Sequence, residues 1–71
     1  MPEFTQLQKE IIRYIRRERF AMREDIIRDV SYYAGCTKKE VQEQLSHLRK
    51  HGHVFRVPEG WYETDVDVDA G

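Results

Sequence analysis

The chain has 71 residues, of which 39% are hydrophobic and 35% charged, and its formal net charge is −1. This length favours one domain with a thin core, because so small a domain buries only about 60% of the surface that its unfolded chain exposes. We therefore expect no deep catalytic cleft, no membrane span of about 20 apolar residues and, with Cys36 as the only cysteine, no internal disulfide. The start "MPEFTQLQKE" lacks the features of a signal peptide, and we expect a soluble cytoplasmic protein.

The charges are unevenly distributed along the chain. All 12 lysines and arginines lie at or before Arg56, whereas five of the 13 acidic residues follow it. We expect a basic folded domain over residues 1–64 and a flexible acidic tail over residues 65–71. A modestly basic body is compatible with a polyanionic partner.

Apolar residues at helical spacing predict a first helix near the start of the chain. In "TQLQ", Thr5 and Gln8 have the spacing of a capping box. We expect this helix to end near Glu18 or Arg19. Its apolar stripe consists of Phe4, Leu7, Ile11 and Ile15.

A second helix is predicted over residues 23–34, and Gly35 suits the left-handed position that follows a helix end. Its periodicity places Tyr33 on the core side and leaves Tyr32 exposed. Exposed Tyr32, together with parts of the first helix, is a candidate for a homodimer contact. The expected apolar face consists of Ile26, Val30 and Tyr33.

The third helix has the clearest start signal. "TKKE" has the spacing of a capping box, in which the Thr37 hydroxyl accepts from the amide of Glu40 and the Glu40 side chain reaches back. Gly52 is expected to close the helix after a basic last turn. The buried stripe consists of Val41, Leu45 and Leu48.

Two short runs, "HVFRV" and "WYET", predict a hairpin, because they are rich in strand formers and enclose a Pro58-Glu59-Gly60 turn. A lone two-stranded hairpin is marginally stable in water, so it must pack against the helices. We expect Phe55, Val57 and Tyr62 to cover their apolar faces. The predicted fold class is therefore α+β, mainly α, with three helices and a C-terminal two-stranded hairpin.

The segment "VQEQLSHLRKHGHVFRVPEGWYET" resembles the winged-helix (winged helix-turn-helix) family of DNA-binding domains. The match consists of Leu45, Leu48, Gly52, Val54-Phe55, Arg56, the turn and Trp61-Tyr62. The resemblance implies that the third helix enters the DNA major groove and that the hairpin, the wing, touches an adjacent groove or the backbone. It also implies a short strand at Ala21-Met22 that pairs with the wing.

The polar face of the third helix supplies the candidate DNA-reading residues. Gln42 can pair with adenine, Arg49 or Lys50 with guanine or phosphate, and Ser46 with several bases. Glu43 can accept from cytosine but repels phosphate. The predicted DNA-binding residues are Lys38, Lys39, Gln42, Glu43, Ser46, Arg49, Lys50 and, on the wing, Arg56.

The sequence thus predicts sequence-specific binding of double-stranded DNA by a small transcriptional regulator, acting as a dimer on paired half-sites. Its size suits a phage, viral or plasmid genome. The alternative is a winged-helix module that binds protein rather than DNA, which the near-neutral total charge, Glu43 and the acidic tail favour. No phosphate-binding loop, nucleophile–base pair or acid pair stands out, so neither an enzyme nor a cofactor is expected.

The sequence also contains four weaker signals. A zinc site at His47, His51 and His53 with Cys36 is not expected, because the spacing matches no standard zinc signature. Cys36 itself reads as a small packed hydrophobe rather than an intermolecular disulfide. The segment is also similar to Z-DNA-binding winged helices, but Gln42 and Ser46 replace the asparagine and tyrosine of that family. The first helix also carries a basic run, which is usually a solvated face and less often binds phosphate or an acidic partner: Arg13, Arg16, Arg17 and Arg19.

Overall fold

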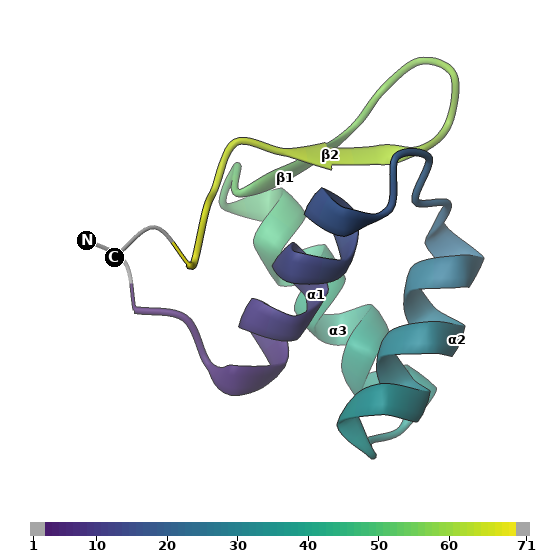
Figure 1. Ribbon diagram of the computed structural model, residues 1–71, viewed down its shortest axis with the longest axis vertical. Coiled ribbons are helices and arrows are strands. Elements are labelled where there is room, and N and C mark those ends of the chain that lie inside the picture. Colours follow the sequence, from purple (N-terminus) through teal and green to yellow (C-terminus); the bar gives the residue numbers. More distant parts are fainter. Residues whose placement is uncertain (1–2, 70–71) are drawn as a thin grey trace.

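The computed structural model describes residues 3–69, which form three α-helices followed by a two-stranded antiparallel hairpin (Figure 1). None of the described helices is long and apolar enough to cross a membrane. This arrangement confirms the predicted α+β layout of a winged helix. The elements are α1 (Gln6–Arg17), α2 (Arg23–Ala34), α3 (Lys38–Lys50), β1 (Val54–Arg56) and β2 (Tyr62–Thr64).

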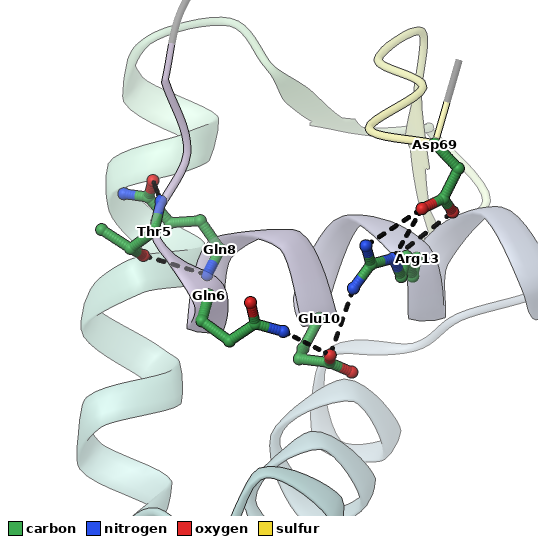
Figure 2. A network of polar contacts seen from close by, with 6 residues as sticks. All are labelled: Thr5, Gln6, Gln8, Glu10, Arg13 and Asp69. Carbon is green, nitrogen blue, oxygen red and sulfur yellow. Dashed lines mark hydrogen bonds and ion pairs between the residues drawn. The ribbon is translucent and has the colours of Figure 1, made fainter. Parts of the chain in front are cut away.

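Helix α1 begins with the predicted capping box. The Gln8 amide donates to the Thr5 hydroxyl at 3.2 Å, and the Thr5 amide donates to the Gln8 side-chain oxygen at 2.9 Å (Figure 2). The Gln8 amide nitrogen Nε2 also donates to Oε1 of Gln44 at 2.9 Å, which joins α1 to α3. One side chain therefore fixes both the start of α1 and its position against α3. The buried side of α1 consists of Gln8, Ile11, Ile12, Tyr14 and Ile15.

Helix α2 ends where Gly35 adopts φ = +68°, as predicted. The prediction for Tyr33 is wrong, because its side chain is 72% exposed. Its angle around the helix does match that of Val30, but it lies in the last turn, at the edge of what α1 and α3 cover. The buried residues of α2 are Ile26, Ile27, Val30 and Ser31.

Helix α3 starts at the predicted cap, where the Glu40 amide donates to the Thr37 hydroxyl at 3.1 Å. The reciprocal bond from the Glu40 side chain does not form within residues 3–69, so only half of the expected capping box is present. The predicted buried stripe is confirmed. Val41, Leu45 and Leu48 are each at most 2% exposed.

The hairpin covers the core with alternate side chains. Val54 and Tyr62 are 1% and 3% exposed, whereas Phe55 is 41% exposed on the opposite face, so its predicted core position is wrong. Neighbouring strand residues point to opposite faces, and Val54 takes the inward place. The Tyr62 amide donates to the Ala21 carbonyl at 2.8 Å in an isolated bridge, which gives the wing the extra pairing expected before α2.

The acidic segment after β2 lies against α1 (Figures 1 and 2). Val66 and Val68 are half-buried and pack against the core. The Arg13 guanidinium forms an ion pair with Asp69 at 3.0 Å, and Arg16 forms one with Asp67 at 3.5 Å. The valine and aspartate residues alternate, so the valine side chains pack on the core while the aspartate side chains pair with the arginines of α1. Residues 70 and 71 of the expected tail lie outside the described residues.

Candidate nucleic-acid interface

The candidate interface is built on the side of α3 that faces away from the core. At about 100° per residue, Lys39, Glu43, Ser46 and Lys50 lie opposite the buried stripe. Gln42 and Arg49 lie to one side of them, and Arg49 reaches the start of α2. We call these six residues, with Lys38 in the first turn, the outer face of α3. All of the sequence-predicted DNA-binding residues are exposed: Lys38, Lys39, Gln42, Glu43, Ser46, Arg49, Lys50 and Arg56.

A hollow of about 260 Å³ lies where the start of α2, the end of α3 and the wing meet. Three arginines, each from a different element, line it, and we call it the arginine pocket. Glu24 also lines it, but the three guanidinium groups outnumber its single carboxylate, so the net charge of the lining is positive. The complete lining is Met22, Arg23, Glu24, Arg49, Arg56, Gly60 and Tyr62.

Local packing fixes the position of two of these arginines. The Arg56 Nε donates to the Gly60 carbonyl at 3.3 Å, and the Arg49 guanidinium lies over the Tyr62 ring, 6.0 Å from its centroid. Gly60 adopts φ = +111°, and a Cβ atom there would lie 3.7 Å from the Arg56 guanidinium and 3.5 Å from the Met22 side chain. These are ordinary contact distances, so it is the positive φ that favours glycine at this position of the wing turn, whose carbonyl holds Arg56 beside α2.

The start of α2 adds backbone donors to the arginine pocket. Met22 precedes the helix and offers no side-chain cap, so the first-turn amides, beginning at Arg23, have no acceptor from the helix itself. Amides at a helix N-terminus together with guanidinium groups suit the oxygen atoms of a phosphate. Arg23 was not among the sequence-predicted site residues, although its place directly after an uncapped helix start was a usable signal.

The three histidines gather at the end of α3, on the side nearest α1. The ring centroids of His47 and His51 are 4.3 Å apart, and those of His51 and His53 are 6.4 Å apart. Among residues 3–69, no group of three or more His, Cys, Asp or Glu side chains is placed to hold a metal ion.

The basic run on α1 does not join the outer face of α3. The tail aspartates neutralise Arg13 and Arg16, and Arg17 lies 3.6 Å from Glu18. Helix α1 packs on the buried side of α3, so these arginines point away from its outer face. The described part of the acidic tail therefore contacts α1 rather than the candidate interface.

Buried and half-buried polar groups elsewhere serve the fold. The Tyr14 hydroxyl on α1 donates to the Asp29 carboxylate on α2. Burial and this hydrogen bond raise the pKa of the Tyr14 phenol, whereas the same bond and the Arg28 guanidinium lower the pKa of Asp29. Burial and the nearby Glu40 carboxylate raise the pKa of the half-buried Cys36 thiol, which fits a packed hydrophobe rather than a reactive thiol.

Comparisons with known proteins give no relative of this chain: no family model, no curated protein and no solved structure matches it. The candidate interface is therefore defined by its own geometry. It consists of one exposed helix face with an arginine-lined hollow at its end, and the wing forms one wall of that hollow.

Proposed function

We propose that this protein is a winged-helix protein that binds double-stranded DNA and acts as a small transcriptional regulator. The observation that carries the proposal is the convergence of Arg23, Arg49 and Arg56, from three separate elements, on one hollow beside the outer face of α3. The three guanidinium groups outnumber the one carboxylate of the lining, Glu24, and the resulting positive charge attracts a polyanion. A duplex backbone supplies phosphates along both sides of the groove that a helix enters.

In this proposal α3 lies in the major groove and the arginine pocket holds a backbone phosphate at one end of it. Gln42, Glu43 and Ser46, in the middle of the outer face, would meet base edges, where their donors and acceptors can discriminate sequence. The lysines at the two ends of the helix would meet phosphates. A major groove about 12 Å wide admits one α-helix, so the geometry requires no distortion of α3.

A second candidate function is a module that binds a protein partner. The observation that favours it is Glu43, whose carboxylate lies in the middle of the outer face and weakens contact with any polyanion. Salt dependence separates the two functions, because DNA binding releases condensed counterions and a mixed-charge protein interface does not.

The test is fluorescence anisotropy with a labelled random-sequence duplex over a series of salt concentrations. We expect the logarithm of the binding constant to fall linearly with the logarithm of salt concentration. Replacing Arg23 or Arg49 by alanine should reduce the slope by about one each. The matched control is Arg28→Ala, which removes an exposed arginine from α2 outside the arginine pocket and should leave the slope unchanged.

Two results would contradict the proposal. One is binding that is undetectable at low salt or independent of salt, which would favour the protein-binding module. The other is an equal loss of slope in Arg23→Ala and Arg28→Ala. That result would mean that any surface arginine contributes equally to DNA binding and that the arginine pocket is not a specific phosphate site.

A further inference from the structure

The C-terminal end of α2 carries the most exposed large hydrophobic side chains of the described chain. Tyr32 is 82% and Tyr33 72% exposed, against 60% for Phe20 and 41% for Phe55. The two tyrosine rings pack edge to face, with centroids 5.6 Å apart and planes at 80°. This contact holds both rings in place, so little conformational entropy is lost when a partner covers them.

Tyr33 stands between two hollows that differ in charge. The first, of about 110 Å³, has Tyr14 and Val30 in its floor and Arg13 and Arg17 at its rim. The second, of about 460 Å³, has Leu7 and Cys36 among its partly buried lining residues and exposed Ala34 and Glu40 at its edge. Glu10 borders both hollows. We call the two tyrosines and these two hollows the tyrosine patch.

The tyrosine patch is complementary to itself. It contains two projecting aromatic rings and two hollows, with Arg17, which lies 3.6 Å from Glu18, at the edge of one hollow and Glu40 at the edge of the other. A twofold axis normal to the surface, near Tyr33 and Glu10, would bring Arg17 of one copy against Glu40 of the other. An interface between identical copies related by such an axis needs this property, since the same surface must supply both halves.

We propose that the tyrosine patch binds a second copy of this chain and forms a twofold homodimer. The patch lies at the C-terminal end of α2 and the arginine pocket at the N-terminal end, and Figure 1 shows these as opposite ends of the helix, so pairing leaves the arginine pocket free. A twofold dimer presents two copies of that pocket, which suits paired DNA half-sites.

The size of the tyrosine patch predicts a weak dimer. Two tyrosine side chains bury about 150–250 Å² each at most, and a stable complex buries about 800 Å² per partner. The chain alone should therefore exchange between monomer and dimer at micromolar concentrations or above. Binding to two half-sites on one duplex would strengthen the pairing by raising the effective concentration of the two copies.

The test is sedimentation velocity over a concentration series without DNA, so its result does not depend on the proposed DNA binding. Tyr33→Ala should weaken association about tenfold or more, as expected for an aromatic residue at the centre of an interface. The matched control is Phe55→Ala, which removes a partly exposed aromatic ring from the wing and should leave association unchanged.

A charge exchange tests the twofold arrangement itself. Arg17→Glu and Glu40→Arg should each weaken association, and the double variant should restore it, because the exchanged charges again face each other across the axis. Circular dichroism checks that each variant keeps its helices. A monomer at every concentration, an unchanged association in Tyr33→Ala, or a double variant no better than the single ones would overturn the proposal.

Discussion

The two sides of α3 differ in what holds them in place. Val41, Leu45 and Leu48 on the inner side are nearly inaccessible to water, and each contacts the packed core. The outer face carries charged and polar side chains that the fold leaves in solvent. Packing therefore constrains which residues can stand on the inner side, whereas the residues of the outer face are constrained only by what they bind. Neighbouring residues such as Leu48 and Arg49 should have opposite consequences when they are changed.

The largest expected effect is that of Leu48→Ala on stability. The side chain is fully buried, and removing it leaves a cavity that costs about 2–5 kcal/mol in the free energy of unfolding. Urea denaturation followed by circular dichroism measures this loss. DNA affinity, corrected for the folded fraction, should not change. A loss below about 0.5 kcal/mol, the range of ordinary surface changes, would show that the inner side is not packed as described.

Much of this comparison was predictable from sequence, because it depends on local signals. Thr5, Thr37 and Gly35 mark helix ends through backbone hydrogen bonds and a positive φ angle, and all three positions are confirmed, although the Glu40 half of the Thr37 capping box does not form among the described residues. Tyr33 was placed wrongly because periodicity gives the angle around a helix but not how far its neighbours extend along it. Phe55 was placed wrongly because the sequence alone did not show that Val54 takes the inward position.

The candidate site was only half predictable for the same reason. The outer face of α3 follows from helix periodicity, and every residue expected there is exposed. The arginine pocket does not follow from periodicity, since Arg23 is far from Arg49 and Arg56 in the chain and meets them only when α2 packs beside α3 and the wing. The contact of the tail with Arg13 and Arg16 likewise depends on tertiary packing.

The second prediction concerns Arg49, the direct neighbour of Leu48. Arg49→Ala should change the free energy of unfolding by less than about 1 kcal/mol, because the side chain is exposed and loses only its contact with the Tyr62 ring, while DNA binding weakens at low salt. Paired urea and anisotropy measurements on the same sample separate the two effects. A variant that unfolds more readily yet binds DNA normally would reverse the roles given to the two sides of α3.

A third prediction has the opposite sign. Glu43→Gln removes a negative charge from the middle of the outer face, so binding to random-sequence DNA should tighten by a few fold at low salt and less at high salt. Anisotropy at two salt concentrations measures this. The control is Glu63→Gln on β2, an exposed acid away from α3, and an equal gain in both variants would point to net charge rather than to the outer face.

The smallest effect is expected at Asp29, a polar group that belongs to the fold rather than to the outer face. Its pKa is lowered by the Tyr14 hydroxyl and the Arg28 guanidinium, so its contribution to stability is present above pH about 4 and is lost as pH falls through the lowered value. Asp29→Asn should flatten the fall in melting temperature at acid pH. Asp65→Asn, which removes an exposed tail carboxylate, should leave the fall in melting temperature at acid pH unchanged.

The central claim is that the outer face of α3 and the arginine pocket together form a DNA-binding surface. Amide chemical-shift mapping by NMR during titration with a short duplex tests it most directly. The account predicts the largest shifts in residues 38–50, at the wing turn 56–61 and at the start of α2, residues 22–24, with small shifts in α1. No shifts at low salt, or the largest shifts on α1 and the acidic tail, would contradict it.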